Sequence, residues 1–374
     1  MKTVFFGPWI GEFGWEFMHW YAWVSRVCQE DFKDYYKIAS SFSGREPFYP
    51  DVDKFIAHPN DFTKIFVSQR NYITDHWKGI RPQPNSSNNF LFKNNKQETS
   101  SSIPENQIQN AEKLLNLYVN ELPKDTIFFV PWRENYYEKH NLEFGIFDEG
   151  GKTPLMNTLD FITVKVLKRT VGKISDKWEW LNIKDYNINN EGFLVKRIPF
   201  EKQNFFKLSP TNDGHKKFLD IYNPANRKPI ISVFPRFRKE RRTDKNWSEG
   251  NYLKIIDFLK SQYPQYDIAV LGAPGGCYFV GNPPDDCIDL INIDDDSRMD
   301  IHIAALRNSI FALGGLSGAI LVSLAAGCPS LTWGHETARI RAEEENLLDT
   351  KFIYLGDEQP ELGHIQEILK ENLG

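Results

Sequence analysis

The feature that most constrains the fold is a regular alternation of short apolar runs and amphipathic segments after Pro229. Six strands are predicted there, at 230–235, 266–272, 286–293, 310–315, 329–334 and 351–356. Helices are predicted at 248–263, 297–309, 316–327 and 360–373. Strands that alternate with helices indicate a parallel sheet with helices on both of its faces. The sequence therefore predicts an α/β fold.

The same pattern, less regular, occurs near the start of the chain. Strands are predicted at 2–6, 35–40 and 125–132, and helical segments from Gly14 onward and at 104–122. A chain of 374 residues is longer than one core usually spans, so we expect two Rossmann-like domains facing a cleft that binds the ligand. We place the first at 1–222, with insertions, and the second at 229–356. The last segment, 357–374, carries a helix that could pack back on the first domain.

Two regions of the first half resist assignment. The segment 81–102 is rich in Asn and Ser, which predicts a long loop or a partly disordered insertion. Residues 136–206 predict no firm element.

Charge and cysteine content exclude some classes of protein. The net charge is −5, which argues against a surface that grips nucleic acid as a whole, although a local basic groove stays open. Cys28, Cys277, Cys287 and Cys328 form no CxxC pair, so free thiols are expected. No apolar stretch approaches the roughly 20 residues of a membrane span, and the start does not fit a signal peptide. We expect a cytoplasmic protein without integral membrane contact; peripheral association stays open.

The glycine-rich stretch FALGGLSGA lies where a predicted strand gives way to a helix. Gly314 and Gly315 allow a tight turn and close approach to a ligand, and Ser317 stands near the start of the helix. Free N–H groups and the dipole make a helix N-terminus an anion site. The alternative is a plain strand–helix turn with a serine cap.

A basic run, PRFRKERRTDKNW, follows the first strand of the second domain. Its cationic candidates are Arg236, Arg238, Lys239 and Arg242. Basic side chains at a strand's carboxyl end can neutralise a pyrophosphate. A solvated charged loop is the alternative. Two such features at strand ends of one domain favour phosphate binding.

A run of aspartates, Asp294 to Asp296, superficially forms a DxD metal clasp. Nothing else supplies oxygen ligands at a suitable spacing, so capping of the next helix by Asp295 or Ser297 is the better interpretation. We therefore expect no metal. His302 is interpreted as structural, and His335 with Glu336 as residues at a strand end that could line the cleft.

The loop GPWIGEFG after the first strand is no Walker A motif and matches GxGxxG imperfectly. Carboxylates would repel phosphate there, so the loop is expected to face a non-phosphate partner, with Glu12 as a candidate general base. Glu12 could instead accept loop N–H groups, and Glu16 could act as a first-turn dipole partner. His19, three residues after Glu16, is a further catalytic candidate or a structural histidine.

These segments resemble the heptosyltransferase family of GT-B glycosyltransferases, with a looser similarity to fucosyltransferases. The matching motifs are PRFRKERRTDKNW, AVLGAPGG, HIAALRNSIFALGGLSG and AILVSLAAGCP, together with Gly11–Glu12, and they cover roughly the last 40% of the chain plus its first 30 residues. The resemblance adds Gly272, Leu316 and Gly318 to the donor-binding candidates. Where the family has His after GLS this chain has Gly318, and where the family has Asp it has Glu12.

The resemblance implies an inverting, metal-independent transfer of sugar from a nucleotide-sugar donor to an acceptor hydroxyl, with Glu12 as the base. No other cofactor is implied. The acceptor could be a surface glycan, a small molecule or a modified base in nucleic acid. A polysaccharide pyruvyl transferase or sugar epimerase is an alternative enzyme class, and a nucleotide- or glycan-binding protein is the non-enzyme alternative.

Overall fold

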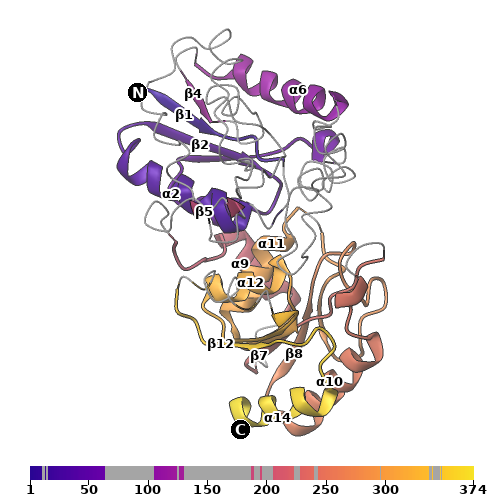
Figure 1. Ribbon diagram of the computed structural model, residues 1–374. Coiled ribbons are helices and arrows are strands. Elements are labelled where there is room, and N and C mark those ends of the chain that lie inside the picture. The colour runs from indigo at the N-terminus through magenta and orange to yellow at the C-terminus, as the bar shows by residue number, and fades with distance from the viewer. Residues whose placement is uncertain are drawn as a thin grey trace. The chain divides into compact units, whose positions relative to one another are not determined.

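The computed structural model forms two compact units, one of residues 1–43 and 48–204 and one of residues 44–47 and 205–374 (Figure 1). The described residues are 1–10, 13, 16–63, 105–123, 126–129, 187–188, 194–195, 205–222, 228–239, 243–294, 296–336, 339, 346 and 348–374.

The first unit is built on a four-stranded parallel sheet. Its strand order is β3 (Lys54–Ala57), β2 (Tyr36–Ser41), β1 (Thr3–Phe6) and β4 (Ile127–Phe129). The apolar side chains of β1, Val4, Phe5 and Phe6, are fully buried, as expected for a parallel strand with both faces covered.

Three helical segments accompany this sheet: the π-helical turn η1 (Glu16–Trp20), which runs into α2 (Tyr21–Glu30), and α6 (Glu105–Glu121). A short 3₁₀ turn, η2 (Glu46–Phe48), follows β2, and the strands β5 (Asn187–Ile188) and β6 (Leu194–Val195) form a separate antiparallel pair.

The second unit is built on a six-stranded parallel sheet. Its order is β12 (Phe352–Leu355), β11 (Ser330–Trp333), β10 (Ser309–Gly315), β7 (Ile230–Phe234), β8 (Asp267–Leu271) and β9 (Ile288–Leu290). Counted within this unit, the order is 6-5-4-1-2-3, which is the doubly wound Rossmann order. The predicted α/β class is confirmed in both units.

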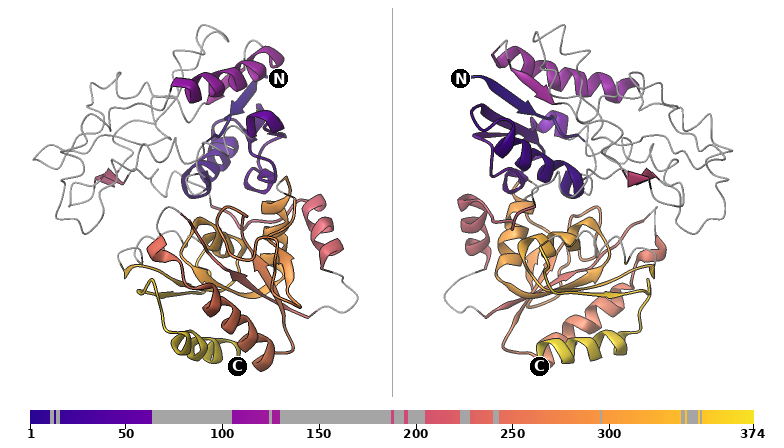
Figure 2. Two further views of the ribbon diagram at one scale, coloured as in Figure 1. Left: turned by 90° about the vertical axis from the view of Figure 1, so that its right-hand side faces the viewer. Right: turned by 60° about the vertical axis from the view of Figure 1, so that its left-hand side comes forward.

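Helices cover both faces of the second sheet (Figure 2). On one face, α10 (Glu249–Gln262) and α14 (Leu362–Leu373) pack on a core that contains alternate strand residues such as Ile231, Val233 and Trp333. On the other, α11 (Arg298–Arg307) and α12 (Gly318–Ala326) contact β10, and α9 (Asn212–Ile221) packs on α11.

The unit boundaries differ from those expected. Residues 205–222 belong to the second unit because α9 packs on α11, and not to the first domain as predicted. The C-terminal helix α14 is no separate segment, because Ile365, Leu369 and Leu373 are buried in the core that includes α10 of the second unit.

Two expectations about composition can be compared with the structure. All four cysteines are free; three are buried and Cys287 is half-buried. Among the helices that the structure describes, none has the length and apolarity to span a membrane. The Asn- and Ser-rich segment 81–102 lies outside the described residues.

Candidate active site

The second sheet has its topological switch point between β7 and β10, where the strand order reverses. Ligands of doubly wound folds bind outside the carboxyl ends of the strands at such a point. The register pairs Phe234 with Gly314 and Trp333 with Gly315, so β7, β10 and β11 end side by side. Arg236 follows β7 closely, and an ideal Cβ on Gly315 would lie 3.6 Å from its Cδ. The structure thus brings together the basic run and the glycine pair.

The basic run is held in place by Asn246, a residue that sequence reasoning missed. Arg236 is buried, and its Nη1 donates to Asn246 Oδ1 at 2.8 Å. The same Asn246 accepts from the backbone N of Arg238 at 3.0 Å and donates to its carbonyl at 2.8 Å. Lys239 is exposed, and Arg242 lies outside the described residues. The asparagine therefore closes the loop and positions the Arg236 guanidinium.

Two of the predicted glycines are explained by packing. A Cβ on Gly272 would lie 2.8 Å from the side chain of Cys277, and a Cβ on Gly314 would lie 2.7 Å from the Cβ and carbonyl oxygen of Phe234. Gly315 differs, because an added Cβ there would meet only ordinary contacts at 3.5–3.6 Å. Of these three glycines, Gly315 leaves space for a further atom, and that space lies beside Arg236.

The glycine pair leads into the N-terminus of α12. Ser317 is the N-cap and its hydroxyl accepts from Ile320 N at 3.5 Å, so the predicted cap is present. Leu316 N donates to the carbonyl of Trp333 at 2.8 Å, which ties the turn to β11, and Gly318 is the first helical residue. The positive end of the helix dipole therefore lies at the carboxyl edge of the sheet.

A second residue that the sequence did not single out is Tyr252 on α10. It is fully buried, and its hydroxyl accepts from the backbone N of Gly315 at 3.4 Å. Burial raises the pKa of Tyr252 above its usual range, so the hydroxyl stays protonated at neutral pH. Only its helical spacing is visible in the sequence, and that spacing predicts a core residue.

In the first unit, the predicted catalytic residues are only partly described. Glu12 lies outside the described residues, as does the side chain of His19. Glu16 is fully buried, and its Oε1 accepts from Ser41 Oγ at 2.5 Å and from Tyr49 OH at 2.6 Å. These contacts anchor the start of η1 to the end of β2 and to the residue after η2. This is a stronger structural role for Glu16 than that of the dipole partner considered above.

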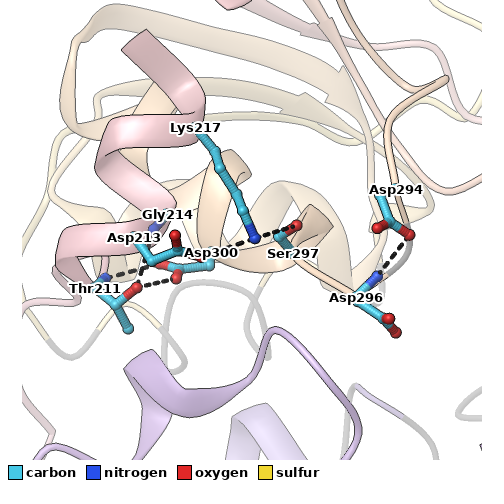
Figure 3. Close-up of polar contacts among 8 residues, drawn as sticks. All are labelled: Thr211, Asp213, Gly214, Lys217, Asp294, Asp296, Ser297 and Asp300. Carbon is cyan, nitrogen blue, oxygen red and sulfur yellow. Dashed lines mark hydrogen bonds and ion pairs between the residues drawn. The ribbon is translucent and has the colours of Figure 1, made fainter. Parts of the chain in front are cut away.

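The two outer residues of the aspartate run, Asp294 and Asp296, are described by the structure. Asp294 and Asp296 are exposed, and Asp294 accepts from the backbone N of Asp296 at 3.4 Å. Ser297 stands at the N-cap of α11, but its side chain makes no capping bond; it accepts from Lys217 Nζ at 3.3 Å (Figure 3). The predicted side-chain cap by Ser297 is therefore wrong, because the backbone of Ser297, at φ −121° and ψ 0°, lies outside the β region that an N-cap normally adopts; Asp295 is not described. Within the described residues, no group of ligands suited to a metal occurs.

A buried carboxylate, Asp300, joins α11 to the start of α9. It accepts from the backbone N of Thr211 at 2.8 Å and also from the Thr211 hydroxyl, which itself accepts from Gly214 N at 3.0 Å (Figure 3). Lys217 pairs with Asp213 at 2.7 Å on the same helix. These hydrogen bonds hold the start of α9 against α11 within the second unit.

Two histidines lie near the second sheet, and they differ in burial. His302 is buried and its Nε2 contacts the carbonyl of Leu290 at 2.7 Å; burial lowers its pKa to about 4, so it is a neutral structural residue as predicted. His335 is exposed, and Glu336 is ion-paired with Arg339 at 2.6 Å, which lowers the pKa of Glu336. Both follow β11.

Comparison with known proteins finds no matching family model and no matching curated protein. Among solved structures, the chain is similar to ADP-heptose LPS heptosyltransferase II of E. coli, at 12% identity, with 100% of this chain and 98% of that chain covered and a TM-score of 0.49. It is similar to a family 9 glycosyl transferase of Veillonella parvula DSM 2008, at 10% identity, with 99% and 88% covered and a TM-score of 0.43. The calicheamicin glycosyltransferase CalG4 matches at 10% identity, with 99% and 89% covered and a TM-score of 0.37. The first of these solved structures is a heptosyltransferase, the family that the sequence motifs resemble.

Proposed function

We propose that this chain is a glycosyltransferase that moves a sugar from a nucleotide-sugar donor to an acceptor hydroxyl. The observation that carries the proposal is the switch point of the second sheet, where a buried Arg236 and the Gly315 turn into α12 lie together. A guanidinium and a helix N-terminus at this position suit a diphosphate.

The proposed mechanism assigns one task to each unit. Arg236, Arg238 and Lys239 offset the charge that develops on the leaving diphosphate, aided by N–H groups near Gly315 and Ser317. Glu12 follows β1, whose sheet has its own reversal between β1 and β4, and takes the proton of the attacking hydroxyl. A single displacement of this kind inverts the anomeric centre. The acceptor is a glycan or a small molecule, with a modified nucleic acid base as a further candidate.

The first experiment is a thermal-shift screen of the full chain against nucleoside diphosphates and nucleotide sugars, because a bound ligand raises the melting temperature by mass action. The best donor is then incubated with candidate acceptors, with and without EDTA, and nucleotide release and the new glycosidic bond are measured. We expect turnover to survive EDTA. Turnover restored only by Mn²⁺ or Mg²⁺ would contradict metal independence. Tight binding without turnover would favour a non-catalytic binding protein.

The role of Glu12 is tested by Glu12→Gln, which keeps the shape of the side chain but removes its basicity. We expect kcat to fall by about 10²–10⁴ while donor affinity is kept. Glu30→Gln is the control, because Glu30 is an exposed residue of α2 that pairs with Arg26 at 2.7 Å. Equal kcat in Glu12→Gln and the parent would remove Glu12 from the mechanism.

A further inference from the structure

Trp333, the last residue of β11, has a buried indole N–H with no hydrogen-bond partner among the residues that the structure describes. The side chain is only 1% exposed. Buried donors are nearly always paired in proteins, so an unpaired one calls for an explanation. The neighbouring Trp247 provides the contrast, because its Nε1 donates to the carbonyl of Pro360 at 2.9 Å.

The unpaired N–H lies beside Gly315, its partner across the β10–β11 ladder. An ideal Cβ built on Gly315 would lie 3.5 Å from Trp333 Nε1, 3.6 Å from the Tyr252 hydroxyl oxygen and 3.6 Å from Arg236 Cδ. These three side chains come from β11, α10 and the basic run. They surround the space that the missing side chain of Gly315 leaves on this face of the sheet.

The polar groups around this space are hydrogen-bond donors. The Tyr252 hydroxyl accepts the backbone N–H of Gly315, which leaves its own proton to donate, and burial keeps that hydroxyl protonated. The Trp333 indole N–H only donates. The Arg236 side chain adds a positive charge, and the first residue of α12, Gly318, follows three positions after Gly315. A site made of donors beside a cation and a helix N-terminus selects an anionic oxygen.

We propose that Trp333 Nε1 and Tyr252 OH form an oxyanion subsite over Gly315 that takes one phosphate oxygen of the donor's diphosphate. The inference rests on the proposed function, which supplies a diphosphate at this strand edge. It adds two recognition residues, neither of them in the basic run or the glycine turn. It also gives a reason for a glycine at 315, where packing alone would admit an alanine.

Two substitutions test the subsite in the full chain, with inorganic pyrophosphate as the probe in isothermal titration calorimetry. Trp333→Phe removes the N–H and keeps an aromatic ring. Gly315→Ala fills the space with a methyl group at ordinary contact distances, so it should fold like the parent. Each is expected to weaken pyrophosphate binding by about 10- to 100-fold, the effect of losing a hydrogen bond to a charged group.

Trp247→Phe is the matched control. It removes a buried indole from the same core, together with its hydrogen bond to Pro360, so it should lower the melting temperature at least as much as Trp333→Phe. The ring of Trp247 packs on Trp333 and Tyr252, at centroid distances of 4.9 and 5.1 Å, but it carries none of the proposed donors, so the pyrophosphate affinity of Trp247→Phe should fall far less than that of Trp333→Phe. If Trp333→Phe fails to fold, Gly315→Ala still decides the question.

A second readout follows the indole itself. The chain has 10 tryptophans, and the ¹⁵N-labelled Nε1–H resonance of Trp333 is identified by its loss in Trp333→Phe. Pyrophosphate is expected to shift this resonance much more than that of Trp247, whose ring packs 4.9 Å away but whose N–H is bonded to Pro360.

The outcomes separate the subsite from the proposed function. If the parent binds pyrophosphate and both variants bind it equally well, the subsite is refuted while the diphosphate site stands. If Gly315→Ala lowers the melting temperature without changing affinity, the space holds a structural water and the subsite is refuted. If pyrophosphate does not bind but nucleotide-sugar turnover is found, the subsite falls and the function stands. Absence of both binding and turnover refutes both.

Discussion

Gly214 in the first turn of α9 gives the sharpest test of the described packing. Replacing a helical glycine by alanine at a compatible position stabilises a protein by about 0.4–1 kcal/mol. At Gly214 the new Cβ would lie 2.1 Å from Asp300 Cγ and 2.3 Å from its Oδ2. No such contact is possible, so the carboxylate of Asp300 must move. It is the acceptor for both the backbone N–H and the hydroxyl of Thr211.

The size of the effect follows from those two hydrogen bonds. Each bond to a charged group contributes about 1.5–3 kcal/mol net. Losing one and subtracting the alanine gain leaves Gly214→Ala about 0.5–2.6 kcal/mol less stable; losing both leaves it about 2–5.6 kcal/mol less stable. The sign is opposite to that expected from helix propensity.

The control is Gly250→Ala in the first turn of α10, where no atom lies within 4 Å of the added Cβ. Thermal unfolding of the full chain, with hydrogen exchange of residues 212–221, measures both variants. For a unit of this size, 1 kcal/mol moves the melting temperature by about 2–4 °C. We expect a lower melting temperature and faster exchange in α9 for Gly214→Ala, and a small rise for Gly250→Ala. A rise in melting temperature for both variants would refute the role of Asp300 in holding the start of α9.

Three further predictions concern single side chains. Glu16→Gln should lower the free energy of unfolding by about 1–3 kcal/mol in urea titrations because it weakens a buried acceptor of two hydroxyls; a loss of kcat at unchanged stability would instead make Glu16 a catalytic residue. His302, with a folded pKa of about 4 against about 6.5 unfolded, should make stability fall as pH drops from about 6.5 to 4, by at most about 1.4 kcal/mol per pH unit, and His302→Asn should lack that slope in pH-dependent unfolding. Arg238→Ala should weaken nucleoside diphosphate binding by about 10- to 100-fold in calorimetry, and unchanged affinity would make the basic run a solvated loop.

Much of the second unit could be predicted from the sequence because its elements are set by local patterns. The helix predicted at 248–263 is α10, Glu249–Gln262, and its start is fixed by Ser248, whose side chain accepts from Asn251 N. The same holds for one helix of the first unit: the helix predicted at 104–122 is α6, Glu105–Glu121. Short apolar runs between turn residues likewise predicted every strand of the six-stranded sheet to within a few residues.

Elements that depend on partners distant in sequence were missed. The turn η1 at Glu16 is a π-helix where the spacing predicted an ordinary helix, and its carboxylate bonds to Ser41 and Tyr49. The helix α9 was not predicted, and it is fastened by Asp300, which lies 89 positions from Thr211. Such contacts leave no periodic pattern within a short window.

The residues of the candidate site fall into the same two groups: those that local sequence marks and those that depend on contacts distant in sequence. Local composition identified the basic run and the glycine turn, because charge and glycine content are visible in a few consecutive letters. The sequence did not single out Asn246, Tyr252 and Trp333, because in their local sequence they are an ordinary loop, helix and strand residue. Their proximity to one another follows only from the arrangement of the strands. The Rossmann order explains why these residues converge, because β7 and β10 are adjacent at the switch point although they lie far apart in the sequence. The loop after β7, Gly315 at the end of β10 and the indole of Trp333 on β11 therefore meet at one edge of the sheet. The residues that a sequence motif marks therefore form only part of this edge. The donors that would fix the position of a phosphate oxygen come from the core beneath it.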